Sequence, residues 1–186
     1  MPALLPIRNR RSRRRSGYLY VAVLFTSLII TAVVTASLTA DLAVTASRGV
    51  TLLADTTLDT VLENDFVMIV LPGGQPGTDN LNADPRIHQL LKRMAAEDKW
   101  LAAICAAPLV LAAAGLLNGC QATAYPGVLG ADKWPQITLR EDAVVIDGRR
   151  ATSRGPGTAM DFALTLIELL IGSARREQVA VSLVRS

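Results

Sequence analysis

Two short, continuous apolar runs and one stretch with helical spacing organise the middle of this chain. The runs at residues 66–71 (FVMIVL) and 100–104 (WLAAI) are typical of strands buried on both faces of a sheet. Between them, residues 84–98 carry apolar side chains every three or four positions, with Asp84 placed as the N-cap and Pro85 in the first turn. The pattern therefore predicts a strand, a helix and a second strand, which is the unit of a parallel sheet.

The same alternation continues on both sides of this unit. Further strands are predicted within residues 33–46, 47–55, 119–125, 143–146 and 150–153, and further helices at 106–114, 158–171 and 174–186. Asp147-Gly148 is a hairpin signal between two of the strands, and Gly172 ends one of the helices. We expect an α/β fold with a mostly parallel sheet and helices on both faces.

Three turns follow predicted strands. They are Pro72-Gly73-Gly74, the turn at Cys105, and residues 154–158 (RGPGT). Ligands of such sheets bind at the carboxyl ends of the strands, and glycine lets backbone N–H groups approach a ligand closely. We therefore expect the three turns to converge on one site.

Cys105 lies at the junction between a predicted strand and a predicted helix. A side chain on such a turn points into solvent above the sheet, beside the unpaired N–H groups of the helix start. A thiol in that position ionises more readily than a free one, so Cys105 is the candidate nucleophile. The alternative is a small buried hydrophobe, which is the usual place of a free cysteine.

The other cysteine and the single histidine offer little further chemistry. Cys120 falls within a predicted strand and is interpreted as a core residue, and His88 lies beside the apolar stripe of a helix as a surface histidine. The two cysteines have neither metal-ligand spacing nor a disulfide framework, which is typical of a reducing compartment. We expect no metal and no cofactor.

The net charge of +3 belongs to one end of the chain. Six arginines lie between Arg8 and Arg15, and the remaining residues are slightly acidic. Such a run is typical of a solvated arm. The charge therefore gives no support to specific nucleic-acid binding by the domain.

An uncharged run of 23 residues follows, at 18–40. As a helix it would be long enough to cross a bilayer core of about 30 Å, and arginines before it are typical of a secretory signal or an anchor. Membrane insertion is the leading interpretation of residues 11–32 taken alone. Residues 33–46, however, are rich in β-branched residues and threonine, which favours strands. We divide the chain into residues 1–32 and a domain at 33–186.

Three motifs, in this order, carry a resemblance to a known family. VLPGGQPGTDNL, AAICAAP and TSRGPGTAMDFAL resemble the ThiJ/PfpI superfamily, in particular its YajL-like and DJ-like branch, over residues 33–172. The resemblance implies a flavodoxin-like three-layer sandwich, usually a homodimer. It also implies a cytoplasmic protein of carbonyl-stress or oxidative-stress defence, with a membrane anchor as the alternative location.

The resemblance also assigns roles to residues. Cys105 matches the family nucleophile, and Gly74 and Ala106 match the positions whose backbone N–H groups bind an oxyanion. Arg48 matches an arginine of an anion site near the dimer interface, for which a solvated turn is the alternative. The pocket-wall positions are Gly73, Tyr125, Gly155, Pro156 and Gly157, and a purely structural turn role is open for the last three.

Two departures from the family pattern affect the chemistry. Tyr125 stands where some members have a histidine, although YajL-like members also lack it. No Asp or Glu precedes Asp41, so the glutamate that moves protons at the family's cysteine has no counterpart. The family's first strand and helix are accordingly expected to be missing or replaced. A misassigned start or frameshift in the coding sequence is one hypothesis, and a fused membrane anchor is the other.

These observations lead to two principal functional hypotheses. The first is a Cys105-dependent glyoxalase or deglycase acting on methylglyoxal-type aldehydes or their adducts with amines and thiols, slowed by the missing glutamate. The second is a redox-responsive chaperone or sensor in which Cys105 is oxidised. A membrane-tethered domain is a third hypothesis.

Overall fold

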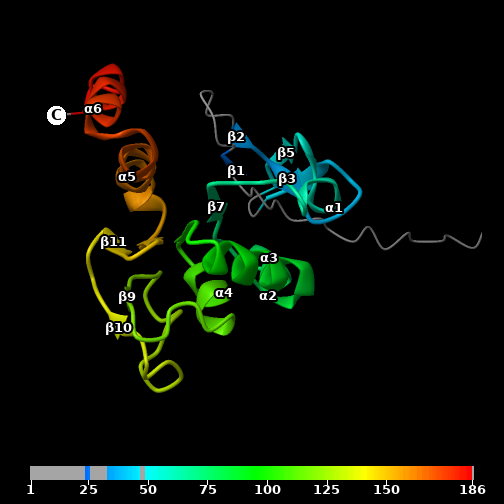
Figure 1. The fold of residues 1–186 in the computed structure, drawn as a ribbon, viewed down its shortest axis with the longest axis horizontal. Helices are drawn as coiled ribbons and strands as arrows, with labels where there is room; N and C mark the ends of the chain where they lie inside the picture. Colours follow the sequence, from blue (N-terminus) through cyan, green and yellow to red (C-terminus); the bar gives the residue numbers. More distant parts are fainter. Residues whose placement is uncertain (1–23, 26–32, 47–48, 186) are drawn as a thin grey trace, which may run out of the picture.

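The computed structural model describes residues 24–25, 33–46 and 49–185 (Figure 1). Within these residues the strands are β1 (Leu24–Phe25), β2 (Val33–Val34), β3 (Ala36–Ser37), β4 (Ala43–Thr45), β5 (Thr51–Leu53), β6 (Thr56–Thr57), β7 (Met68–Leu71), β8 (Trp100–Ile104), β9 (Gln121–Ala122), β10 (Thr138–Leu139), β11 (Val144–Asp147) and β12 (Arg150–Ser153). The helices are α1 (Leu58–Val61), α2 (Gly77–Ala83), α3 (Pro85–Ala96), α4 (Pro108–Ala113), α5 (Ala159–Ile171) and α6 (Ser173–Ser182), with a 3₁₀ turn at Pro156–Thr158.

A four-stranded sheet in the order β11-β12-β8-β7 forms the centre of the molecule. β7, β8 and β12 run parallel, and β11 pairs antiparallel with β12 through the predicted hairpin. β8 occupies the predicted residues, and β7 is two residues shorter than the apolar run that indicated it. The predicted α/β fold is confirmed.

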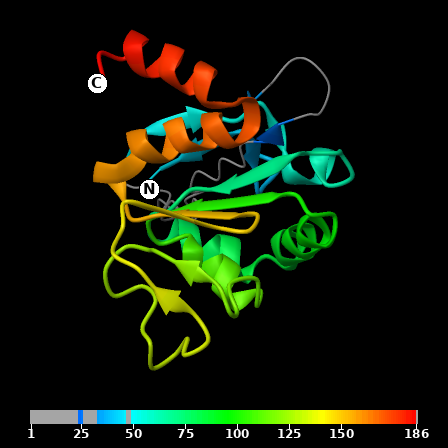
Figure 2. The same cartoon turned by 60° about the vertical axis from the view of Figure 1, so that its left-hand side comes forward.

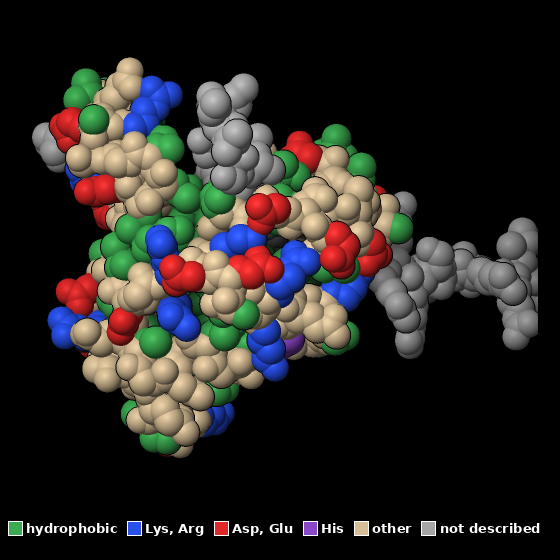
Figure 3. Space-filling view, viewed as in Figure 1, with side chains coloured by type: hydrophobic (Ala, Val, Ile, Leu, Met, Phe, Trp, Pro, Cys, Tyr) green, Lys and Arg blue, Asp and Glu red, His purple; other side chains and the backbone are tan. Residues whose placement is uncertain are grey.

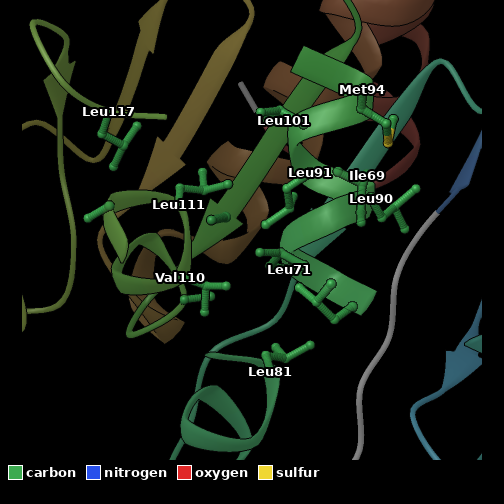
Figure 4. Close-up of a cluster of buried hydrophobic side chains, with 14 of the residues drawn as sticks. Ile69, Leu71, Leu81, Leu90, Leu91, Met94, Leu101, Val110, Leu111 and Leu117 are labelled. Atoms are coloured by element: carbon green, nitrogen blue, oxygen red, sulfur yellow. The ribbon is translucent and has the colours of Figure 1, made fainter. Parts of the chain in front are cut away.

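Helices cover both faces of this sheet. Ile69 and Leu71 of β7 join the cluster of buried side chains on the α3 and α4 side (Figure 4). The alternate residues, Met68 and Val70, join a second cluster that includes Phe162 of α5. Figure 2 shows the result, with α5 and α6 (orange and red) on one side of the sheet and the green helices on the other. This is the three-layer arrangement that the sequence predicted.

Helix α3 forms where its capping residues and apolar stripe place it. The side chain of Asp84 accepts a hydrogen bond from the backbone N–H of Arg86 at 2.9 Å, and Pro85 opens the helix. The stripe of Ile87, Leu90, Leu91 and Met94 is buried. His88 was interpreted as a surface histidine; it is half-buried instead, and its Nε2 lies 2.8 Å from the carbonyl oxygen of Asn82.

The uncharged run at 18–40 contains strands in its described part. β1 pairs antiparallel with β2, and β3 pairs parallel with β6. The interpretation of the whole run as one membrane helix is therefore wrong for these residues, because Val33–Val34 and Ala36–Ser37 pair with other strands. Among the described residues, no helix has the length and apolar character needed to span a bilayer.

Other predictions for the N-terminal region lie outside the described residues. These are the arginine-rich arm, residues 26–32 of the apolar run, and Arg48. The expected loss of the family's first helix also falls there. The division at residue 33, the homodimer and the cytoplasmic location stay predictions.

Two predictions for the middle of the chain need correction. The strand expected at 119–125 is only Gln121–Ala122, and Cys120 precedes it as a half-buried residue whose Sγ faces the carbonyl oxygen of Asn118 at 3.8 Å. It is therefore not a core residue. Helix α2 was not predicted, because its sequence GTDNLNA holds several weak helix formers; burial of Leu81 stabilises it instead.

Arg86 links three elements at the edge of this framework. Its guanidinium contacts Asp84 at 2.5 Å, Asp59 of α1 at 2.6 Å, and the carbonyl oxygen of Leu38 at 2.8 Å. The hydrogen bond from Arg86 holds the pKa of Asp84 below its ordinary value, and Asp84 in turn raises the pKa of Arg86. Basic and acidic side chains intermingle over α1 and α3 on the face shown in Figure 3.

Replacing this guanidinium is expected to destabilise the fold. Arg86→Gln leaves the Leu38 carbonyl and Asp84 short of their donor, so we predict that the free energy of unfolding falls by about 1–3 kcal/mol in denaturant titrations. Lys92→Gln, the same replacement at an exposed position of α3, is the matched control and should change it by less than about 0.5 kcal/mol.

The effect of Arg86→Gln should also depend on pH. Because the folded-state pKa of Asp84 is lowered, its contribution is fully present above the unfolded-state pKa of about 3.9 and is lost as pH falls through the folded-state value. The difference between the original chain and the variant should therefore shrink below about pH 4. A difference that stays constant down to acid unfolding would contradict this role of the pair.

Candidate active site around Cys105

Cys105 occupies a left-handed backbone conformation immediately after β8. Its φ is +64°, which is costly for any residue other than glycine. Two hydrogen bonds hold the turn: the Cys105 N–H donates to the Ser153 carbonyl oxygen at 2.9 Å, and the Tyr125 N–H donates to the Cys105 carbonyl oxygen at 2.8 Å. Neighbouring segments thus impose the strain, which is the usual situation at functional sites.

The side chain of Cys105 is half-buried rather than sealed in the core. It carries a free thiol, and no hydrogen bond joins its Sγ to another group of the described residues. The alternative of a small buried hydrophobe therefore does not describe this residue. The residue is thus partly exposed, and hydrogen bonds hold its backbone on both sides.

The Pro72-Gly73-Gly74 turn lies directly against the Cys105 turn. A Cβ at Gly73 would stand 2.5 Å from the Cβ of Cys105 and 2.6 Å from the carbonyl oxygen of Ile104, so only glycine fits. Gly74 has a φ of +96°, and its carbonyl oxygen accepts from the Thr78 N–H at 2.8 Å. The two turns meet because β7 and β8 are parallel neighbours in the sheet.

The backbone N–H groups of Gly73, Gly74 and Ala106 have no acceptor among the described residues. The last two are the positions to which the resemblance assigned the binding of an oxyanion. Ala106 directly follows Cys105 and is 6% exposed. Helix α4 begins only at Pro108 and has six residues. The positive potential beside Cys105 therefore comes from individual backbone N–H groups rather than from the dipole of a long helix.

The third turn reaches the same neighbourhood through Tyr125. A Cβ at Gly155 would stand 3.4 Å from the ring of Tyr125, whose N–H bonds to Cys105. The hydroxyl of Thr158 accepts from the Gly155 N–H at 3.0 Å and lies 2.7 Å from that of Ser153, which fixes the turn. The expected convergence is therefore present for Gly155 and Tyr125.

Pro156 and Gly157 differ from the rest of this turn. Both are exposed, and a Cβ at Gly157 would meet no atom within 4 Å. Their assignment to the pocket wall stays a prediction, as does the anion-binding role of Arg48, which lies outside the described residues.

The described residues supply no carboxylate to the thiol. No Asp or Glu side chain of this part of the chain bonds to Cys105, in keeping with the absence of acidic residues before Asp41. Within the same residues, no group of three or more His, Cys, Asp or Glu could hold a metal ion. The arrangement can therefore present a nucleophile and oxyanion donors, but the general acid/base must come from elsewhere.

A hollow beside this site was not foreseen from the sequence. It has a volume of about 290 Å³, and its lining includes Tyr125, Arg140 and Arg154. Arg154 opens the RGPGT turn, which is the one sequence signal pointing to it. Arg140 follows the short strand β10. No sequence motif marks it as a lining residue, because segments distant in the sequence bring it to the hollow.

Sequence comparisons agree with this geometry. Residues 20–169 match the DJ-1/PfpI family. Protein DJ-1 homolog A of Arabidopsis thaliana is 40% identical over 149 residues, or 80% of this chain and 38% of that protein, so the chain spans little more than a third of that relative. Glutathione-independent glyoxalase DJR-1.2 of Caenorhabditis elegans is 36% identical over 126 residues, or 68% of this chain and 67% of that protein.

A comparison with solved structures gives the same result. The crystal structure of Drosophila melanogaster DJ-1beta superposes with a TM-score of 0.78, at 37% identity over 82% of each chain. On this sequence match and this shared fold, the chain belongs to the DJ-1/PfpI family.

Proposed function

We propose that this protein uses Cys105 to attack the aldehyde carbon of small α-oxoaldehydes such as methylglyoxal, or of their early adducts with amines and thiols. The observation that supports this most is the Cys105 turn itself. A half-buried thiol stands on a strained turn, pressed against Gly73, next to N–H groups without acceptors among the described residues. Similarity to a protein named as a glutathione-independent glyoxalase supports the substrate class.

The proposed chemistry follows from these groups. The Cys105 thiolate forms a bond to the aldehyde carbon, and the carbonyl electron pair moves to the oxygen. The N–H groups of Gly74 and Ala106 stabilise that oxyanion, and losing one such donor typically costs about 100-fold or more in rate.

The remaining steps balance within the substrate. The proton on the attacked carbon moves to the neighbouring carbonyl carbon, which is reduced while the attacked carbon becomes a thioester. Water then hydrolyses the thioester, releasing lactate and restoring the thiolate. General acid/base help with such a proton transfer typically contributes about 100- to 10,000-fold. Because the described residues offer Cys105 no carboxylate, we expect slow turnover.

Oxidation of Cys105 is the second candidate function. Its half-buried, free thiol is accessible to a small oxidant, and oxidation to sulfenic or sulfinic acid requires no base to move protons between carbons. This hypothesis of a redox-responsive sensor or chaperone therefore does not suffer from the missing glutamate as the first does.

Removing the thiol tests the first hypothesis. Cys105→Ser should lower the conversion of methylglyoxal to lactate by about 100-fold or more, to the level of the reaction without protein. Cys120→Ser is the matched control, because Cys120 is also free and half-buried, and it should retain activity within about twofold. Equal turnover by the Cys105→Ser variant and the original chain would end the proposal.

A methyl group at Gly73 tests the backbone arrangement. Gly73→Ala forces its Cβ into the Cys105 turn, so we expect the alkylation of Cys105 by iodoacetamide to change and methylglyoxal conversion to fall by about tenfold or more. Gly157→Ala adds the same methyl group in open space. If Gly157→Ala converts methylglyoxal as fast as the original chain, Gly157 has a structural role in the turn. A lower rate would support its role in the pocket wall.

Mild peroxide treatment tests the second candidate. If Cys105 is a redox-sensing thiol, intact mass should show one or two added oxygen atoms, which peptide analysis places on Cys105 and not on Cys120. Equal oxidation of both cysteines, or none at Cys105, would argue against sensing.

A further inference from the structure

The hollow of about 290 Å³ and the Cys105 turn share one residue, Tyr125. Tyr125 forms part of its lining, and the backbone N–H of Tyr125 bonds to the Cys105 carbonyl oxygen at 2.8 Å. Arg154, also in the lining, directly precedes Gly155, whose backbone lies against the Tyr125 ring. Cys105 itself does not line the hollow.

The lining carries two guanidinium groups from separate strand ends. Arg140 follows β10, and its Nε pairs with Asp142 at 3.1 Å. Arg154 follows β12, and its Nη1 donates to the main-chain carbonyl oxygen of Glu141 at 2.8 Å. A carbonyl oxygen orients a guanidinium without neutralising it. Within the described residues, the Arg154 guanidinium therefore forms no ion pair and keeps donors free for a ligand.

Glu141 is the one carboxylate among the lining residues, and its side chain forms no ion pair with Arg140 or Arg154 within the described structure. With Arg140 already paired, the hollow offers one oriented guanidinium fork to a ligand. A ligand with one negative charge would neutralise the Arg154 guanidinium. A planar carboxylate also matches the arrangement of the guanidinium N–H donors.

The remaining lining suits a short carbon chain. Leu129, Leu139 and the half-exposed ring of Tyr125 provide apolar surface. The volume is at the lower end of the range for small-molecule sites, about 300–1,000 Å³. This volume accommodates a chain of a few carbons with a carboxylate.

We propose that this hollow is a subsite for the carboxylate end of the substrate, so that the preferred carbonyl compounds are short α-oxoaldehydes with a carboxylate at their far end, whose aldehyde carbon reaches Cys105. Simple ω-oxo acids share the two ends and add to the thiol reversibly, so they serve as probes of the subsite. This inference rests on the proposed function, and it names Arg154 as the residue that determines specificity for the anionic end. Addition of the thiol to the aldehyde is unchanged: the sulfur–carbon bond forms and the carbonyl oxygen takes up a proton.

A protection experiment on the full chain tests whether one ligand places its carboxylate at Arg154 and its aldehyde at Cys105. The rate of Cys105 alkylation by iodoacetamide is measured by mass spectrometry, in the Cys120→Ser background, with ω-oxo acids of four to six carbons and with unsubstituted aldehydes of equal length. We expect the best ω-oxo acid to give half-protection at a concentration about tenfold lower than its matched aldehyde. Equal half-protection concentrations across the series would overturn the proposal.

Variants of single arginines show which residue gives the ω-oxo acid its stronger protection of Cys105. Arg154→Gln should remove the advantage of the acid, Arg154→Lys should retain part of it, and Arg149→Gln should leave it unchanged. Arg149 is the matched control because it stacks on Trp100 and pairs with Asp98, away from the hollow. Thermal melting confirms that each variant is folded. An advantage that survives in folded Arg154→Gln would overturn the assignment.

A second measurement separates this inference from the proposed function. In Cys105→Ser, which has no covalent step, calorimetry compares hexanoate with hexanol. Binding of hexanoate that is weakened about tenfold by Arg154→Gln supports the subsite even if no aldehyde protects Cys105, in which case the proposed function alone fails. Equal, weak or absent binding of both probes would overturn the subsite.

Discussion

The close approach of the Gly73 backbone to the Cys105 turn is the contact on which the site depends. A side chain of any size at Gly73 would collide with the Cβ of Cys105 and the Ile104 carbonyl oxygen. The parallel pairing of β7 with β8 brings the two turns together, and a third strand, β12, holds the Cys105 N–H through Ser153. The strained φ of Cys105 is thus imposed by the sheet.

The packing behind the turns explains why the sheet is rigid enough for this purpose. Alternate residues of β7 and β8 enter the two buried clusters, so the strands that carry the turns are fixed from both faces.

The site itself lacks one of the groups that the proposed chemistry uses. Its described residues give the thiol backbone N–H groups but no carboxylate, which favours nucleophilic addition or oxidation over rapid proton transfer.

The secondary-structure elements could be predicted from the sequence where their own residues carry the pattern. The apolar run of β8, the Asp-Gly hairpin before β12 and the capped stripe of α3 each carry their own pattern, and the structure agrees. Helix α2 and the short extent of β9 could not be predicted, because contacts with distant segments stabilise these elements rather than their own propensity. The hollow at Arg140 and Arg154 depends on the same kind of contact and was missed for the same reason.

The absence of Asp and Glu before Asp41, in contrast, is visible in the sequence alone. The most direct test of the account is whether an aldehyde carbon becomes bonded to Cys105. Carbon-13 NMR of methylglyoxal labelled at its aldehyde carbon, mixed with the full chain, should show a protein-bound carbon that is no longer an aldehyde or its hydrate, and prior alkylation of Cys105 should abolish that signal. Spectra containing only free methylglyoxal and its hydrates, with the thiol intact, would contradict the account.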